Sequence, residues 1–300
     1  MFGNRVLKGV FLVGLGATSY GMLATFVKLA YQENFTTAEV TSSQFIIGII
    51  GLLLINTFQK IKKGNEVVKA SRNNIFRLMI AGTSMGFTSI FYYLAVKFIP
   101  VSIGIVLLMQ TVWMGVLLEV FLNKKAPSFQ KIIAVLIVLI GTVLATNLLE
   151  NEINLDWRGI VLGLLAAASF TTTMFTSNRV ALEISTSQRS LFMLLGGAII
   201  VFSFAFLTQT TPFNTSIFIK WGIILALFGT IIPPMLLNAG FPHTGIGLGS
   251  IVASIELPVS VMMAYFLLNE AVSSTQWLGI SIIVAAIVIM NLKFKKEKLI

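Results

Sequence analysis

The stretch KGVFLVGLGATSY at residues 8–20 decides how this chain is built, because a related stretch returns 150 positions further on. The second copy, RGIVLGLLAAASF at residues 158–170, keeps the basic residue, the glycine after it and most small and apolar positions. Each copy opens a set of five apolar segments. An odd number of spans per set means that the second set enters the membrane in the opposite orientation. We therefore expect two inverted halves, residues 1–149 and residues 150–300.

Short polar motifs support this duplication. The segment at 41–44, Thr-Ser-Ser-Gln, opens the second apolar segment and is similar to Ser-Thr-Ser-Gln at 185–188, which opens the seventh. Four residues near the end of the first half recur 146 positions later: Leu122, Asn123, Ser128 and Gln130 return as Leu268, Asn269, Ser274 and Gln276. Inverted repeats are typical of transporters, which bind substrate near the middle of the membrane between the halves.

Composition places nearly the whole chain in the bilayer. Of its 300 residues, 56% are hydrophobic and only 11% are charged, whereas a soluble domain carries about a quarter charged residues. The apolar runs are about 20 residues long, enough to cross ~30 Å of hydrocarbon as helices. The predicted fold class is an all-α integral membrane protein with ten transmembrane helices. The spans cover roughly residues 8–30, 40–58, 76–96, 101–122, 131–149, 158–178, 188–207, 219–239, 246–268 and 276–293.

The basic residues indicate the orientation in the membrane. The net charge is +10, but lysines and arginines sit at helix ends and not on one folded surface, which argues against a nucleic-acid partner. Most of them lie at the N-terminus, the C-terminus and the 2–3, 4–5 and 6–7 connections; the last carries Arg179 and Arg189. The positive-inside rule then predicts that both termini are cytoplasmic, in a plasma or inner membrane.

Several classes of protein are disfavoured by missing residue types. Cysteine is absent and His243 is the only histidine, which leaves no basis for a metal site, a thiol site or a cofactor. The sequence also lacks an HExxH pair and a clustered acid/base constellation, so we expect no enzyme and no catalytic residues. A channel or a lipid scramblase remains an alternative to a carrier.

The most diagnostic stretch lies between residues 229 and 291. It contains Gly229-Thr230, Pro233-Pro234, Asn238-Ala239-Gly240, Glu256-Leu257-Pro258, Leu268-Asn269-Glu270 and Gln276-Trp277-Leu278-Gly279. This pattern resembles the C-terminal half of the drug/metabolite transporter superfamily, in its EamA-like branch. The first half departs from it, since Lys124 stands where Glu270 would predict an acid and Val112 where Pro258 would predict a proline.

The resemblance implies ten helices around a central cavity lined mainly by helices 1, 3, 4, 6, 8 and 9. Relatives move amino acids, other small metabolites, nucleobases, drugs or nucleotide sugars. By resemblance, we expect export of an amino acid or a similar polar solute, with a drug or nucleobase carrier as the alternative.

Glu256 is the sharpest candidate for a functional residue. It lies near the middle of the ninth predicted span, where an acidic side chain costs roughly 2.5–3.5 kcal/mol. Such a group normally faces a cavity or a partner. Three interpretations remain open: contact with a cationic or donor group of the substrate, coupling to protons or another ion, and a carboxyl hydrogen-bonded within the bundle.

Other polar residues complete the list of candidates. Gln110 matches Glu256 by the 146-residue offset, and Trp113 lies one turn further along the same face. Ser84, Thr88 and Tyr92 form an i, i+4, i+8 stripe on the third helix, although hydroxyl stripes usually serve helix packing. A lining role would favour an uncharged or zwitterionic solute. The substrate-binding candidates are Glu256, Gln110, Trp113, Tyr92, Thr88, Ser19 and Asn238.

Prolines are candidates for coupling or gating together with Glu256. Pro233, Pro234 and Pro258 remove backbone donors inside predicted helices, so we expect kinks beside the cavity. Near the cytoplasmic end of the fourth helix, Glu119 is expected to reach toward Lys124 and Lys125.

A Gly-x-x-x-Gly motif at residues 82–86 predicts close helix packing within one copy of the chain. The protein should accordingly be a monomer or a weak dimer.

Overall fold

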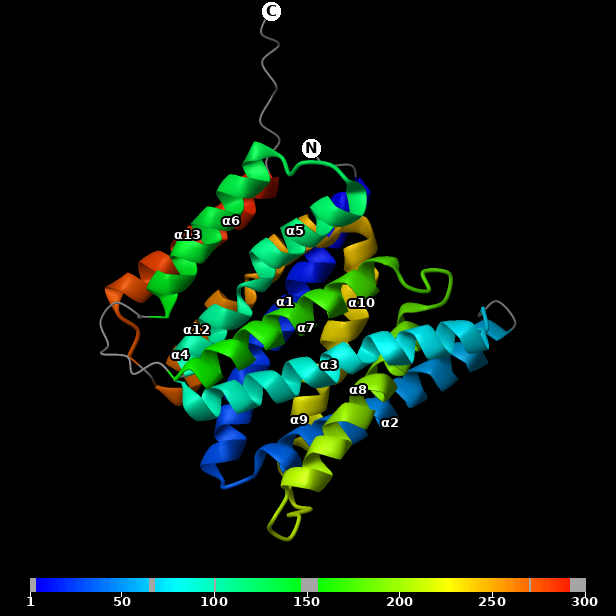
Figure 1. The fold of residues 1–300 in the computed structure, drawn as a ribbon. Helices are drawn as coiled ribbons and strands as arrows, with labels where there is room; N and C mark the ends of the chain where they lie inside the picture. Colours follow the sequence, from blue (N-terminus) through cyan, green and yellow to red (C-terminus); the bar gives the residue numbers. More distant parts are fainter. Residues whose placement is uncertain (1–3, 65–67, 100, 147–155, 270, 292–300) are drawn as a thin grey trace, which may run out of the picture.

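The computed structural model describes residues 4–64, 68–99, 101–146, 156–269 and 271–291, and every regular element among them is a helix (Figure 1). In chain order the elements are α1 (Asn4–Gln32), α2 (Thr37–Lys63), α3 (Arg72–Phe98), α4 (Val101–Leu108), α5 (Thr111–Asn123), α6 (Phe129–Ala145), α7 (Trp157–Arg179), α8 (Thr186–Thr208), η2 (Phe218–Gly222), α9 (Ile223–Ala226), η3 (Leu227–Ile231), α10 (Ile232–Thr244), α11 (Ile246–Ala253), α12 (Glu256–Leu268) and α13 (Ser274–Asn291). The ends of the predicted fifth and tenth spans, at 149 and 293, lie outside the described residues.

Length and apolar character fit a membrane protein. Within the described ranges, eight helical stretches are long and apolar enough to cross a membrane, and the apolar helices α6 and α13 are shorter. An all-helical membrane fold is therefore confirmed.

Side-chain caps begin several of these helices. Thr36 and Glu39 form a capping box at the start of α2, and Ser71, Ser128, Asp156 and Ser185 cap the starts of α3, α6, α7 and α8. Each cap satisfies an amide that has no partner within its helix.

The fourth and ninth predicted spans are each interrupted by a short turn. A disturbance was predicted at Pro258 in the ninth span, whereas the one in the fourth span was not predicted. The chain turns at Met109–Gln110 between α4 and α5, and at Ser254–Ile255 between α11 and α12. In the second break the carbonyl of Ser254 accepts from Leu257 N at 3.2 Å, because Pro258 has no N–H to offer it. The two interruptions are 145 positions apart, one fewer than the 146 that separates the matching sequence motifs, and the first has no proline.

The eighth predicted span is helical throughout but unevenly wound. Two π-helical turns, η2 and η3, flank the short α9, and η3 ends directly before α10. Pro233 and Pro234 occupy the first turn of α10. Because η3 runs directly into α10, the two prolines remove amide donors from a continuous helical stretch. The carbonyl of Phe228, in η3, accepts from the Ser19 hydroxyl of α1.

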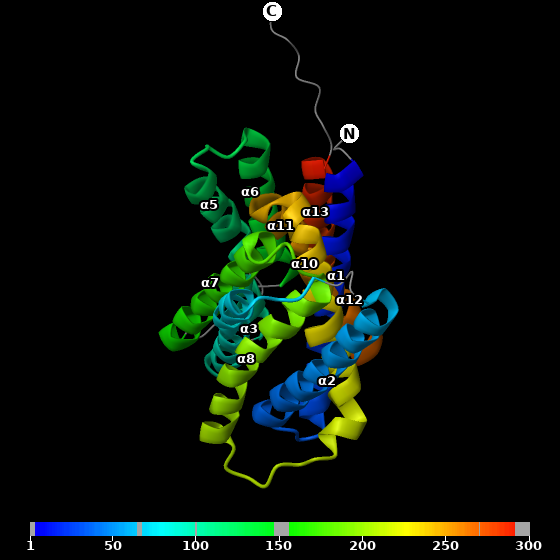
Figure 2. The same cartoon turned by 90° about the vertical axis from the view of Figure 1, so that its right-hand side faces the viewer.

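Small residues bring the long helices close together. α3 packs along α7 and α8, α6 along α13, and α1 along α10 and α12 (Figures 1 and 2). Gly82 and Gly86 of α3 face the backbones of Met193 and Gly197 in α8, so closely that a methyl group at either glycine would overlap them. This confirms that the Gly-x-x-x-Gly motif packs within the chain.

Arg189 corrects one assignment of the basic residues. It was counted in the 6–7 connection, but it lies in α8 with only 2% of its surface exposed. Its guanidinium donates to the carbonyls of Thr176, Ser177 and Val180 at the end of α7, and to Asn238 of α10 at 2.7 Å. A buried guanidinium is tolerated because its donors are satisfied by the free carbonyls of a helix C-terminus.

Candidate functional site

A cavity of about 450 Å³ lies between the helices and is lined by residues from both halves of the chain. The helices implied by the resemblance all contribute through α1, α3, α4, α7, η3 and α12. α2, α6 and the start of α13 also contribute, through Gln44, Thr146 and Gln276 among others. The volume falls within the range of small-molecule sites.

The position of the cavity along the bundle follows from α1. Near the beginning of this helix, Gly9 packs against His243 and Thr244. One turn later, Val13 and Ala17 belong to a packed apolar core shared with α5, α7 and α11. From Tyr20 onward α1 lines the cavity. The cavity therefore occupies the half of the bundle away from the end at which α1 begins and α13 ends (Figures 1 and 2).

Glu256 lies in the cavity wall at the first residue of α12. Among the described residues its carboxyl group accepts no hydrogen bond and forms no ion pair, and the phenol groups of Tyr20 and Tyr92 are its electrostatic neighbours. Gly21 of α1 lies against its backbone carbonyl, where a methyl group would come within 2.5 Å. The Glu256 carboxyl therefore lies beside the turn at Ser254–Ile255 with no hydrogen-bond partner among the described residues.

Two other predicted residues line the same cavity. Thr88 and Tyr92 project from α3. Thr88 donates its hydroxyl hydrogen to the carbonyl of Ser84 at 2.8 Å, while Tyr92 packs edge to face on Tyr93 with ring centres 6.1 Å apart. Glu256, Thr88 and Tyr92 are therefore brought together from helices that are distant in sequence.

The other four substrate-binding candidates are not in the cavity lining. Gln110 bonds the carbonyl of Val106 and accepts from the indole of Trp113 at 2.8 Å. Ser19 donates to the carbonyl of Phe228, and the buried Asn238 donates to the hydroxyl of Ser190 at 2.9 Å. In this conformation these side chains make contacts within or between helices, and their role in binding stays a prediction.

Tyr20 is the cavity residue that sequence reasoning missed. It ends the stretch at 8–20, and its counterpart in the second copy is Phe170. Both line the cavity and pack edge to face with ring centres 6.0 Å apart. The repeat itself therefore pointed to this position, because Tyr20 and Phe170 are equivalent residues of the two copies.

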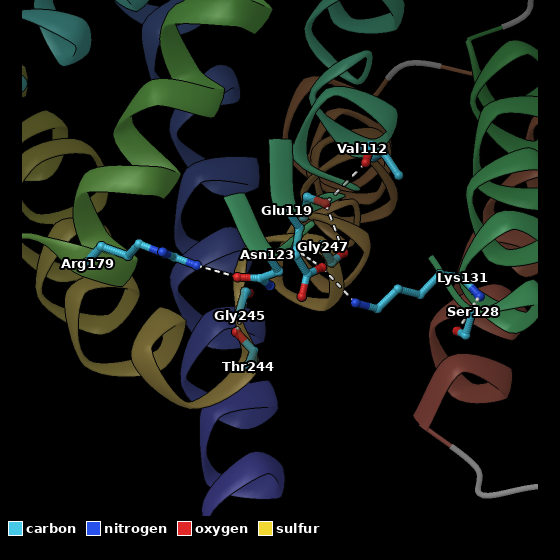
Figure 3. Close-up of polar contacts among 10 residues, drawn as sticks. Val112, Glu119, Asn123, Ser128, Lys131, Arg179, Thr244, Gly245 and Gly247 are labelled. Carbon is cyan, nitrogen blue, oxygen red and sulfur yellow. Dashed lines mark hydrogen bonds and ion pairs between the residues drawn. The ribbon is translucent and has the colours of Figure 1, made fainter. Parts of the chain in front are cut away.

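A polar network joins the two halves at the end of the bundle opposite the cavity (Figure 3). The carboxylate of Glu119 in α5 accepts from Lys131 Nζ of α6 at 2.6 Å and from the amide of Gly247 at the start of α11 at 3.0 Å. Beside it, Ser250 of α11 donates to the carbonyl of Val112 at 3.2 Å. A methyl group at Gly247 would overlap the Glu119 carboxylate.

This network corrects the expected partners of Glu119. Lys124 and Lys125 were expected, but the carboxylate lies at the N-terminus of α11, where amides lack partners and the helix dipole favours a negative charge. Lys131, from the next helix, completes the contact.

At the other end of the bundle, carboxylates tie the connecting segments to α1 and α2. Glu39 of α2 accepts from the amide of Asn214 at 2.7 Å and from Gln209 at 3.2 Å. The hydrogen bond from Lys220 lowers the pKa of the Glu33 carboxyl below its ordinary value. These contacts hold the segment between α8 and η2 beside the C-terminal end of α1.

Membrane-length helices around a cavity of metabolite size define the class: a multi-pass membrane protein with the architecture of a transporter. The chain belongs to the EamA-like transporter family, whose model matches residues 7–147 and, a second time, residues 157–292. The resemblance inferred from residues 229–291 is thereby confirmed, and this family consists of membrane transporters of the drug/metabolite type.

Two further comparisons concern fold and sequence. One solved crystal structure superposes with a TM-score of 0.76, covering 97% of this chain and 99% of its own, at 16% sequence identity. This likeness supports the fold alone. Comparison with curated proteins finds no match.

Proposed function

We propose that this protein is a secondary transporter that moves a small organic metabolite, an amino acid or a similar polar solute, across the cytoplasmic membrane by alternating access. The observation that carries the proposal is the Glu256 carboxyl, which lines a solute-sized cavity at the turn between α11 and α12. Among the described residues this carboxyl has no hydrogen-bond or ion-pair partner. Broken helices supply substrate and ion sites in transporters, because the exposed helix ends and carbonyls can bind a solute directly. Export is inferred from the family resemblance.

The proposed topology has ten spans, in two inverted halves, with both termini in the cytoplasm. The shorter α6 and α13 are then the fifth and tenth spans. With this orientation the cavity faces outward, and the network around Glu119 closes the cytoplasmic side. Alternating access requires a second conformation, in which that network opens and the cavity closes at its outer mouth.

Transport into proteoliposomes tests the proposal. A carrier should give saturable uptake that is accelerated by substrate on the opposite side, with amino acids, nucleobases and amines as the trial solutes. Flux that rises linearly with concentration would instead identify a channel, and lipid flipping without solute flux would identify a scramblase.

Glu256→Gln tests the role of the carboxyl itself. We expect Glu256→Gln to lose transport or the pH dependence of transport, with an unchanged amount of folded protein. The reason is that an amide carries no negative charge and does not take up a proton near neutral pH. Glu183→Gln is the matched control, since Glu183 lies outside the spans and bonds Asn74 at the surface. Wild-type rates across the pH range in Glu256→Gln would rule out this role.

A further inference from the structure

Several hydroxyl groups of the cavity wall are available as hydrogen-bond acceptors. The hydroxyl groups of Thr88, Ser89, Thr146 and Thr230 already donate to carbonyls of the protein, at 2.8–3.2 Å. A hydroxyl that has donated its hydrogen can still accept through its lone pairs. Together with the Glu256 carboxylate, these groups suit a solute that brings several donors.

The charges of the cavity wall are unevenly placed. Among the lining residues that the structure describes, Glu256 is the one acid and Lys28 the one base. Lys28 lies seven residues beyond Gly21, which packs against the Glu256 backbone, so the two positions are about 10 Å apart along α1. An α-amino acid carries both charges on a single carbon. With its ammonium at Glu256, its carboxylate would have the phenols of Tyr20 and Tyr92 as neighbours but no cationic group at this end of the wall.

The remainder of the wall is apolar and aromatic. Tyr20 of α1 and Phe170 of α7 pack edge to face, and Tyr92 lines the cavity from α3. Leu108 and Val261 contribute aliphatic surface. Aromatic faces attract cations, and their attraction is strongest where water is excluded. A carboxylate with no cationic group beside it disfavours anions, which need a positive partner.

We propose that the substrates of this cavity are amines: monocations with an apolar or aromatic body and no required acidic group, bound with the ammonium at Glu256 between Tyr20 and Tyr92. An ammonium group has three donors and no acceptor, which matches the Glu256 carboxylate and hydroxyl groups that have already donated their hydrogens. This inference rests on the proposed transport function and, within its class of small organic metabolites, favours amines over amino acids.

Three probes that share one body separate the possibilities: phenethylamine, phenylalanine and 3-phenylpropionate. Affinity for the purified full-length protein is measured by calorimetry at equal pH and salt. We expect phenethylamine to bind at least about tenfold more tightly than phenylalanine, and 3-phenylpropionate not to bind, because the added carboxylate has no cation beside Glu256. Equal or tighter binding of phenylalanine, or measurable binding of 3-phenylpropionate, would overturn the inference.

Variants tie the preference to the carboxylate. Glu256→Gln should weaken phenethylamine binding at least about tenfold, whereas Glu256→Asp should keep the order of the three probes because the charge remains. Glu183→Gln, which lies outside the cavity, should match the wild type. An unchanged phenethylamine affinity in folded Glu256→Gln, judged by its thermal midpoint, would also overturn the inference.

The outcome is distinguishable from failure of the proposed function. If proteoliposomes show saturable flux of some solute but amines are not preferred, the amine inference fails and the transporter proposal stands. If no trial solute shows saturable flux, the proposed function itself fails.

Discussion

Replacing Glu119 by glutamine should loosen the closed end of the bundle. Its carboxylate contacts Lys131 Nζ at 2.6 Å and the amide of Gly247 at 3.0 Å, and the two charged side chains are only 20% and 21% exposed. Glutamine keeps an acceptor for the amide but loses the ion pair. A charge-assisted hydrogen bond contributes about 1.5–3 kcal/mol when buried, and partial exposure with salt screening reduces this to about 1 kcal/mol. The population of the open conformation should then rise about fivefold.

The absence of cysteine from the sequence gives a direct assay. Ser250 of α11 is 1% exposed and packs against Gly115 of α5, beside the Glu119 network. A conservative Ser250→Cys change therefore creates a single thiol that a membrane-impermeant reagent reaches when this end opens. In inside-out vesicles we expect the modification rate of Ser250→Cys to increase about fivefold when Glu119→Gln is added.

Matched variants identify the cause of any change. Lys131→Met should raise the rate as Glu119→Gln does, because either change removes the ion pair, and Glu183→Gln in the Ser250→Cys background should leave it unchanged. An unaltered or slower rate in Glu119→Gln would refute the view that this contact holds the end closed. Faster modification in right-side-out vesicles only would refute the proposed orientation.

Two further predictions concern stability. Gly82→Ala should lower the thermal midpoint by several degrees, because its methyl group would overlap the backbone of Met193 at an expected cost of about 1–3 kcal/mol. The control Gly14→Ala, whose methyl group would have Val252 at 3.8 Å as its nearest contact, should not lower the midpoint. Equal midpoints in the two variants would contradict the packing argument. Arg189→Met should lower the thermal midpoint by roughly 6–12 °C, since it leaves buried carbonyls of α7 and α10 without donors at a total cost of about 3 kcal/mol. Arg189→Lys should lower the midpoint by less. An unchanged midpoint in Arg189→Met would show that those carbonyls find other donors.

The sequence predicted those features that depend on local pattern. Apolar runs located the helices, and Glu256 was singled out because one acid in an apolar span needs a cavity or a partner. Thr88 and Tyr92 were placed on one face by their i, i+4 spacing, and both line the cavity. The proline at 258 signalled a disturbance of the ninth span, which takes the form of a short turn at Ser254–Ile255.

Features that depend on tertiary contacts could not be predicted. Nothing in the residues around Gln110 marks the break between α4 and α5, because no proline or glycine stands there. The sequence also does not show whether a hydroxyl group has already donated its hydrogen. The hydroxyls of Thr88 and Thr146 donate to carbonyls one turn earlier in their own helices, and this is seen only in the structure. Likewise, Lys124 and Lys125 are nearer to Glu119 in sequence, but the fold brings Lys131 and an amide of the other half to it.

The short helix α11 connects the two regions in which function is proposed. Its first turn receives the Glu119 carboxylate at Gly247, and the chain break after its last residue, Ala253, leads directly to Glu256. Eight helical residues span about 12 Å, so the two contacts act on opposite ends of one rigid segment. Coupling between two sites is reciprocal. If α11 moves as a rigid body, binding of a solute at Glu256 must therefore change the strength of the Glu119 contact. Both repeats line the cavity, whereas α11 itself joins the contact made by Glu119 of the first repeat to the interruption before Glu256 in the second.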